Sequence, residues 1–224
     1  CEGSHLELLG SRPHWQRHSG VYINHGHMPM TPGDIRDSIR NKRRALTDAQ
    51  QDTAAAQLAD LLCRQDFFLR AKRIGIYLAN DGEIDPAQII DAAFKDNKAC
   101  FLPVIDPLTQ NSLHFAEYCH GDVLQQNRFG IPEPQLHCAT LAPLWSLDLI
   151  LVPLVAFDRD GNRIGMGGGF YDRTLASSSG QSSDATLVGL AHQCQEIASI
   201  SHQSWDIPLH KIATNQEIIC ARQK

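Results

Sequence analysis

Several features that would assign this chain to a familiar class are missing from its sequence. The seven cysteines are widely spaced and include no C-x-x-C pair, so neither a disulfide framework nor a zinc site is predicted. No apolar run approaches the roughly 18 residues that span a membrane. The formal net charge of −5 argues against a general nucleic-acid binder. The odd cysteine count, with Cys63 and Cys100 in apolar surroundings, indicates a reduced protein of the cytoplasm.

What is present fits one folded unit with an extension. The 224 residues are 42% hydrophobic and 20% charged, which is ordinary for a globular protein with a real core. Residues 1–30 mix Gly, Ser, Pro, Arg and His without apolar periodicity, and they contain no apolar stretch of a signal peptide. We expect residues 1–30 to be a disordered tail and residues 31–224 to be a single catalytic domain, with a monomer favoured.

Helical patterns alternate with short apolar runs along this domain. Helices are expected over Asp34–Ala45, from Thr47 and from Asp85-Pro86 through Ala93, and Thr47 with Gln50 matches a capping box. Strands are expected over Arg73–Ala79, Ala99–Val104, Leu113–Tyr118 (as an edge strand), Leu149–Pro153, Thr186–Ala191 and Gln216–Cys220. The alternation predicts an α/β fold, a three-layer sandwich around a mostly parallel sheet.

Ligands in such folds bind beyond the carboxyl ends of the strands. Three segments are expected to meet there: Asn80–Asp85, the loop-like Phe129–Pro134, and Asp158–Asp172. Ser177–Ser183 is expected to be a surface loop.

The most informative segment is the glycine-rich run from Arg163 to Arg173. Four glycines fall within five residues, between an apolar run that indicates a buried strand and a segment that favours a helix from Tyr171. Glycines let a ligand approach the main chain, and the N–H groups at a helix start attract anions. The run lacks the Lys-Ser or Lys-Thr of a P-loop and matches G-x-G-x-x-G only loosely. A structural turn is the alternative, but Arg163, Tyr171 and Asp172 favour a phosphate site.

A basic cluster lies in the first helix. Arg36, Arg40 and either Arg43 or Arg44 share one face, although the chain as a whole is acidic. Such a face is often simply solvated, yet guanidinium forks suit phosphate oxygens. The cluster is therefore a candidate contact for a phosphorylated ligand.

Carboxylates form two further candidate groups. Asp81-Gly82-Glu83 is either a turn with an exposed carboxylate or a place where Glu83 accepts hydrogen bonds from a ligand. Asp172 and Asp206 are either surface residues or ligands of Mg²⁺, which binds through one or two carboxylates and phosphate oxygens. A charge count favours the metal, because two aspartates beside a triphosphate need a cation between them and the phosphates.

Aromatic residues flank these groups. Tyr77 is more readily explained as a core residue, whereas Phe170 and Tyr171 adjoin glycines, where a core ring is less expected. Phe129 lies in one of the three converging segments.

Together these segments resemble the 5-formyltetrahydrofolate cyclo-ligase family. The resemblance is carried by the glycine-rich run with Val155–Asn162 before it, and by Ile39–Thr47, Asp81–Asp85 and Asn127–Pro134 in the same order. It covers about residues 33–222. It implies a fold like that of the ribose-phosphate isomerase and CoA-transferase group, and ATP-dependent closure of 5-formyltetrahydrofolate to 5,10-methenyltetrahydrofolate with release of ADP and phosphate.

The resemblance also implies roles for individual residues. The reacting centre would include Arg163, Tyr171 and Asp172, and Mg²⁺ would bind Asp172 and Asp206. Folate would contact Leu78, Glu83, Phe129, Met166, Gly168 and Phe170. ATP would contact Arg36, Arg40, Arg163, Ile164, Gly165, Met166, Gly167, Gly168, Gly169, Phe170 and Tyr171.

The chain departs from the family pattern at a few positions. Many members have Lys where this chain has Pro32, and some have basic residues at the positions of Met166 and Gly168. The set of phosphate-binding cations is therefore left open.

The chemistry suits positioning and charge neutralisation without a protein nucleophile. We expect the formyl oxygen to attack the γ-phosphate, after which N10 closes on the activated carbon and phosphate leaves. Two other functions remain open at this point, a sugar-phosphate isomerase on the same fold class and a nucleotide-binding module without turnover.

Overall fold

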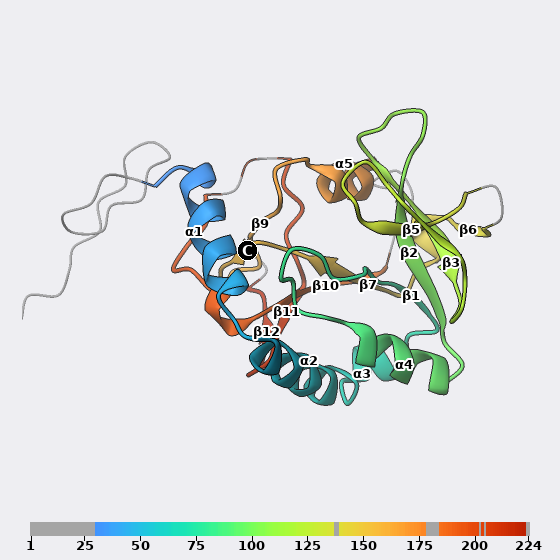
Figure 1. Cartoon of the computed structure of the whole chain (residues 1–224), viewed down its shortest axis with the longest axis horizontal. Coiled ribbons are helices and arrows are strands. Elements are labelled where there is room, and N and C mark those ends of the chain that lie inside the picture. The colour runs from blue at the N-terminus through green and yellow to red at the C-terminus, as the bar shows by residue number, and fades with distance from the viewer. Residues whose placement is uncertain (1–29, 137–138, 178–183, 202, 204, 223–224) are drawn as a thin grey trace, which may run out of the picture.

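The computed structural model describes residues 30–136, 139–177, 184–201, 203 and 205–222. Within these residues one large sheet has the strand order β12-β11-β10-β7-β1-β2-β3-β6 (Figure 1). The five strands from β11 to β2 run parallel, and β12, β3 and β6 are antiparallel to their neighbours. The strand bounds are β1 Arg73–Gly75, β2 Ala99–Ile105, β3 Leu113–Tyr118, β6 Leu141–Ala142, β7 Leu149–Pro153, β10 Thr186–Ala191, β11 Lys211–Thr214 and β12 Ile218–Cys220. The α/β class and the mostly parallel sheet are confirmed.

Helices cover both faces of this sheet. Helices α2 (Asp48–Leu62), α3 (Asp66–Arg70) and α4 (Ala87–Lys95) pack on one face, where Leu58, Phe68 and Ile89 join the core. Helix α5 (Phe170–Ser177) packs on the other face through Leu175. Figure 1 shows α2 to α4 below the sheet, α5 above it and α1 (Pro32–Arg44) beside one end.

Short elements complete the described chain. Two-stranded ribbons pair β4 (Leu124–Gln126) with β5 (Pro132–Pro134), and β8 (Ala156–Phe157) with β9 (Arg163–Ile164). Turns of 3-10 helix are η1 (Leu144–Ser146) and η2 (Gln193–Gln195). No helix among the described residues is both long and apolar enough to cross a bilayer.

Capping residues fix where the first two helices begin. Thr31 and Asp34 form a reciprocal capping box at α1, with Pro32 at the first helical position. Thr47 and Gln50 form the same motif at α2, as the sequence predicted. At α4, the Asp85 carboxylate accepts a hydrogen bond from the Ala87 N–H at 2.9 Å. The two segments that precede α2 and α4 are thereby held in defined turns.

The strand predictions succeed in the centre of the sheet and fail near its edges. Leu149–Pro153 and Thr186–Ala191 form strands with the expected bounds. The expected strand over Arg73–Ala79 ends at Gly75, and Leu113–Tyr118 is not an edge strand, because β6 pairs with it. Strand β11 was not predicted. The predictions for residues 1–29 and for most of Ser177–Ser183 lie outside the described residues.

Candidate active site

The candidate site lies beyond the carboxyl ends of β1 and β7. Helix α1 links the two segments that leave these strands, since Arg36 bonds to Gly165 and Arg40 bonds to Asp81. The third expected segment joins them through a ring contact between Phe129 and Phe170, whose centroids lie 5.8 Å apart at 86°. The predicted convergence of three segments is therefore confirmed.

The glycine-rich segment is an open loop between β9 and α5. Gly167 and Gly169 have φ angles of 97° and 64°, in the left-handed region that favours glycine. Among the described residues, no main-chain N–H group from Gly165 to Asp172 donates a hydrogen bond. Unpaired N–H groups at the start of a helix form a ready binding site for an anion.

Two arginines reinforce this loop. Arg36 donates from Nε to the Gly165 carbonyl at 2.8 Å, and a side chain placed on Gly167 would come within 3.6 Å of its Cζ atom. Arg163 has only 6% of its side chain exposed and donates to the Asp172 carboxylate and to the Ile207 carbonyl. Both cations therefore lie beside the unpaired N–H groups.

Arg163 also brings the two candidate metal ligands into one region. Asp172 is its ion-pair partner, and the carbonyl it binds belongs to the residue after Asp206. Asp206 itself accepts a hydrogen bond from the Gln203 N–H at 2.7 Å. No cluster of three or more His, Cys, Asp or Glu side chains with metal-binding geometry occurs among the described residues. A metal here would need phosphate oxygens as further ligands.

The turn after β1 is held by arginines of α1. Asp81 and Gly82 have φ angles of 52° and 72°, and the Glu83 N–H closes the turn on the Asn80 carbonyl at 3.0 Å. The Asp81 carboxylate pairs with Arg40 at 2.8 Å, with Arg43 at 2.9 Å, and with Arg44. Partial burial opposes ionisation, but the three guanidinium groups hold the pKa of Asp81 below its usual value. This basic helix face is therefore paired rather than simply solvated.

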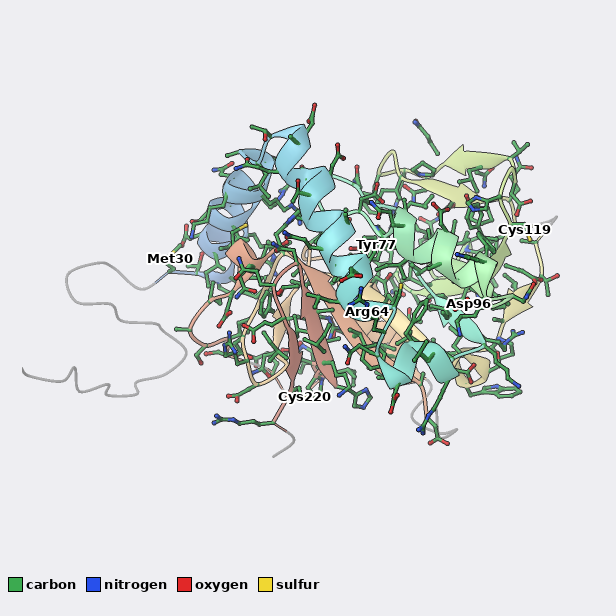
Figure 2. The ribbon with its side chains drawn as sticks, turned by 90° about the horizontal axis from the view of Figure 1, so that it is seen from below. Met30, Arg64, Tyr77, Asp96, Cys119 and Cys220 are labelled. Carbon is green, nitrogen blue, oxygen red and sulfur yellow. The ribbon has the colours of Figure 1, made fainter. Side chains whose placement is uncertain are left out.

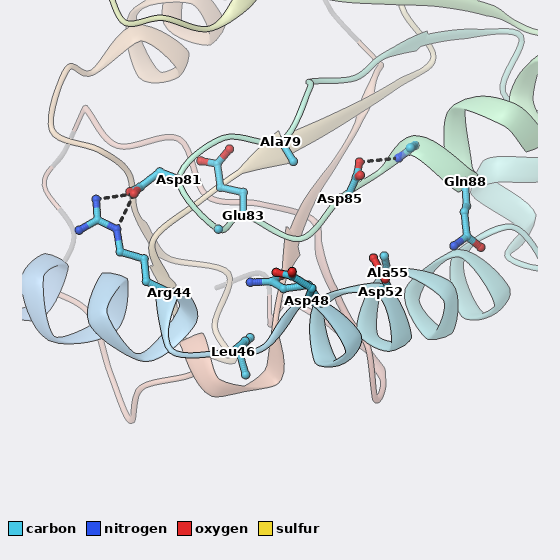
Figure 3. A pocket seen from close by; sticks show the side chains of 13 residues that line it. Arg44, Leu46, Asp48, Asp52, Ala55, Ala79, Asp81, Glu83, Asp85 and Gln88 are labelled. Atoms are coloured by element: carbon cyan, nitrogen blue, oxygen red, sulfur yellow. Dashed lines mark hydrogen bonds and ion pairs between the residues drawn. The ribbon is translucent and has the colours of Figure 1, made fainter.

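Glu83 is a half-buried carboxylate in that turn. Burial raises its pKa to about 7, although Arg43 and the Asn80 N–H, which donates to Oε2 at 3.1 Å, act in the opposite direction. Figure 3 shows Glu83 at a pocket of about 550 Å³. Asp48 and Asp52 of α2 face it from below in that view. A carboxylate poised between its two protonation states at a pocket wall is typical of a functional group.

Two tyrosines lie close to Glu83, and their hydroxyl groups differ in whether they make a hydrogen bond. Tyr77 is 3% exposed, lies among the packed side chains in Figure 2, and donates its hydroxyl to the Ile84 carbonyl at 2.9 Å. It is a core residue, as expected. The buried hydroxyl of Tyr171 has no hydrogen-bond partner within the described residues. Burial, with Glu83 nearby, raises the pKa of Tyr171. An unpaired buried hydroxyl is costly and points to a ligand that completes it.

Exposed apolar side chains lie around the glycine loop. Phe129 is 54% exposed and Met166 is 51% exposed. The Arg128 guanidinium carbon lies 5.0 Å from the Phe129 ring centroid and 5.8 Å from that of Phe170. Leu78 is half-buried against the core below the turn. Rings and a thioether beside a polar loop provide a surface for a flat, partly apolar ligand.

In the sequence, Arg43 is only one of two possible members of the basic face. The structure buries its side chain completely, while Arg44 stays exposed. The signal was available, because Arg43 follows Ile35 and Ile39 at four-residue spacing and so lies on the apolar stripe of α1.

The fold and the site define an α/β protein in which a glycine-rich loop, with N–H groups unpaired among the described residues, adjoins an aromatic surface at the carboxyl edge of the sheet. The family model for 5-formyltetrahydrofolate cyclo-ligases matches residues 31–215. The chain belongs to the 5-formyltetrahydrofolate cyclo-ligase family.

Individual relatives agree with this assignment. The chain is 42% identical over 178 residues to 5-formyltetrahydrofolate cyclo-ligase from Haemophilus influenzae, covering 80% of this chain and 94% of the relative. It is 38% identical over 180 residues to the Escherichia coli K12 enzyme of the same name, covering 80% and 98%. The solved structure of Aquifex aeolicus 5,10-methenyltetrahydrofolate synthetase is 26% identical with a TM-score of 0.74, covering 87% of this chain and 95% of that one.

Proposed function

We propose that this chain catalyses ATP-dependent cyclisation of 5-formyltetrahydrofolate to 5,10-methenyltetrahydrofolate, with release of ADP and phosphate. Membership in the cyclo-ligase family supports the reaction. The observation that carries the proposal is the row of N–H groups from Gly165 to Asp172, which have no partner in the part of the chain that the structure describes and are flanked by Arg36 and Arg163. This arrangement suits a polyphosphate, whose charge a simple structural turn would not need to neutralise.

The ATP phosphates would lie against the glycine loop and the arginines of α1. The family resemblance supports contacts from Arg36, Arg40, Arg163 and residues 164–171. Arg40 is 29% exposed and is paired with Asp81. One or more of its N–H donors can therefore bind a phosphate while the side chain stays bonded to Asp81.

The folate would lie between the turn after β1 and the exposed rings. Glu83 would accept hydrogen bonds from the amino edge of the pterin, and Leu78, Met166, Phe129 and Phe170 would contact its rings. Gly168 would let the two substrates approach, because even a Cβ atom there would lie 2.7 Å from the Phe170 ring.

Mg²⁺ would accompany the nucleotide. Arg163 bonds to the Asp172 carboxylate and to the carbonyl of the residue after Asp206, and oxygen donors from one or two carboxylates plus phosphate are the set that Mg²⁺ prefers. Bound there, the cation would offset charge on the phosphates. Asp172 would also keep Arg163 directed at the loop.

The chemistry needs no covalent bond to the protein. The formyl oxygen attacks the γ-phosphorus, the bond to ADP breaks, and an N5-iminium phosphate forms. N10 then closes on the activated carbon, and phosphate leaves with the former formyl oxygen. The residues of this chain contribute orientation and charge stabilisation, with Arg163 and Tyr171 beside the reacting groups.

Three finer assignments accompany this proposal. The fold would group with the ribose-phosphate isomerase and CoA-transferase architecture. The protein would act as a monomer in the cytoplasm, in keeping with the free thiols of Cys63, Cys100, Cys119, Cys194 and Cys220.

Oxygen transfer tests the proposal. We would supply 5-formyltetrahydrofolate labelled with ¹⁸O in the formyl group, together with ATP and Mg²⁺, and analyse product and phosphate. We expect each released phosphate to carry one labelled oxygen, and the amount of labelled phosphate to equal the amount of methenyl product. Product with unlabelled phosphate would contradict phosphorylation of the formyl oxygen, and absence of product would contradict the function itself.

A further inference from the structure

Arg43 is a fully buried arginine that none of the assignments above explains. Its side chain is 0% exposed and lies on the same stripe of α1 as Ile35 and Ile39. Burying a guanidinium group costs several kcal/mol unless charges and hydrogen bonds compensate for lost water. The groups that Arg43 contacts must therefore compensate for this cost, and they indicate its role.

The contacts of Arg43 join the two halves of the site. Nε donates to the Asp81 carbonyl at 2.8 Å, and Nη2 donates to the Asp81 carboxylate at 2.9 Å. Nη1 lies 3.4 Å from the Leu154 carbonyl, just beyond β7, and Nη2 lies 4.0 Å from the sulfur of Met166 in the glycine loop. One side chain thus contacts the turn after β1, the segment leaving β7 and the loop before α5.

The main chain of Arg43 strengthens this junction. Its carbonyl accepts from the Gln51 side chain at 3.1 Å, which ties the end of α1 to α2. A Cβ atom added to Gly82 would lie 3.5 Å from that carbonyl, so the turn rests directly on this end of α1. The turn therefore has little freedom to shift along the helix.

Asp81 shows why the turn needs a partner. Its φ angle of 52° is uncommon outside glycine and is tolerated when local bonds fix it. Arg43 binds both its carbonyl and its carboxylate, so the bonds define an orientation as well as a distance. Glu83 follows two residues later, so its position at the pocket depends on this orientation.

We propose that Arg43 is a positioning residue that holds the Asp81–Glu83 turn and Met166 in one geometry. The folate-binding turn and the phosphate-binding loop then keep a fixed separation, and the formyl oxygen meets the γ-phosphate. This inference rests on the proposed function. It does not require Arg43 to touch either substrate.

The chemistry of the side chain accounts for arginine at this position. A guanidinium group presents five N–H donors in a planar fork, whereas a lysine ammonium group is a compact charge with flexible reach. Lysine would keep the charge at position 43 but could not bind the carbonyl and carboxylate of Asp81 and the Leu154 carbonyl in one plane.

Arg44 offers a matched comparison. It pairs with the same Asp81 carboxylate, but 48% of its side chain is exposed, and it makes no bond to the Asp81 main chain or to the glycine loop in the described structure. A remote control is Arg64, which is 75% exposed and pairs with Asp60 on α2. All three positions allow the same Arg→Lys change.

The test compares Arg43→Lys, Arg44→Lys and Arg64→Lys with the unmodified protein. A displacement of the reacting groups by about 1 Å can cost on the order of 100-fold, so Arg43→Lys should lower kcat by roughly that factor, even with both substrates saturating. Arg44→Lys should lower kcat by less than about threefold, since exposed pairs contribute little, and Arg64→Lys should match the unmodified protein.

Hydrogen exchange gives a readout that needs no turnover. Exchange of the main-chain N–H groups from Asn80 to Ile84 should quicken by about tenfold or more in Arg43→Lys and stay unchanged in Arg64→Lys. Unchanged exchange together with an unmodified kcat would overturn the inference. Lower stability with unmodified kcat well below the unfolding temperature would assign Arg43 to folding only, and would overturn it as well.

A second variant covers the case in which Arg43→Lys does not fold. Asp81→Asn leaves the apolar stripe of α1 intact and should reproduce the loss of kcat, because it removes the charged partner from the other side. An unmodified kcat in Asp81→Asn would contradict the inference. Inactivity of the unmodified protein would instead contradict the proposed function, and the exchange data would still decide the role of Arg43.

Discussion

At the scale of single residues, the site is marked by polar groups whose hydrogen-bonding capacity is unused. The Tyr171 hydroxyl is buried without a partner, and the N–H groups from Gly165 to Asp172 are unpaired among the described residues. Asp158, by contrast, is buried and accepts bonds from Asp160, Asn162 and Ile200, and His192 Nε2 is the one other buried polar side-chain atom without a partner among the described residues. A fold selected only for stability would be expected to close such gaps.

Glu83 should show opposite pH dependences for catalysis and for stability. Burial raises its pKa to about 7 from an ordinary value of 4.5. The ionised form accepts hydrogen bonds, so kcat/KM for 5-formyltetrahydrofolate should rise as pH increases through about 7. Between these two pKa values the folded state binds a proton that the unfolded chain has lost, so the free energy of unfolding should fall as pH rises from about 4.5 to 7.

The variant Glu83→Gln isolates both effects. It should flatten the pH dependence of kcat/KM and remove the loss of stability, leaving the variant more stable than the unmodified protein at pH 8 by about 1–2 kcal/mol. The measurements are initial rates and urea unfolding at several pH values. Glu117→Gln, on β3, is the matched control. A pH profile in Glu83→Gln that coincides with the unmodified profile would exclude this role.

Asp172 should matter more to nucleotide use than to folding. Asp172→Asn removes a charge beside Arg163 but keeps a side chain that can accept its hydrogen bond. We expect KM for Mg·ATP to rise by at least about tenfold, and the free energy of unfolding to fall by no more than about 1 kcal/mol, because Asp172 is 31% exposed. The control is Asp184→Asn, at the exposed start of the segment before β10. Unchanged Mg·ATP dependence would remove Asp172 from the nucleotide site.

At the scale of elements, a helix or strand can be predicted when its own residues are enough to define it. The central strands β7 and β10 are continuous apolar runs buried on both faces, so their sequences are sufficient to locate them. Strand β1 stops at Gly75 because the chain then turns into the site, although the Ile76 N–H still bonds to the Phe101 carbonyl. Strands β6, β9 and β11 have only two to four residues, and they form because they pair with strands that the local sequence does not specify.

Helix α2 tests the local part of this account. Thr47→Ala removes the side chain that accepts from the Gln50 N–H and should cost about 1 kcal/mol. That loss corresponds to a melting temperature lower by about 2–4 °C in a domain of this size. Turnover should stay unchanged, because Thr47 contacts neither substrate region. Thr53→Ala, which removes an exposed hydroxyl within the same helix, is the control; an equal loss there would contradict the capping explanation.

At the scale of the whole molecule, the sequence predicts which segments form the site but not the ion pairs and hydrogen bonds between them. The three segments were predicted to converge because parallel strands end at one edge of a sheet, and they do. The charge pairing was not predictable from spacing. Three arginines of α1 converge on one carboxylate 37 to 41 residues away, and Arg163 pairs with Asp172 only because the loop between them folds back. Such pairs depend on the assembled fold.

The most direct test of the central claim is the formation of methenyl product by the purified protein. We would follow the near-ultraviolet absorbance of 5,10-methenyltetrahydrofolate after mixing the protein with 5-formyltetrahydrofolate, ATP and Mg²⁺, and after omitting each in turn. The account predicts that the absorbance rises with all three present and stays flat when either substrate or the metal is left out. A flat trace from folded protein in the complete mixture would contradict it.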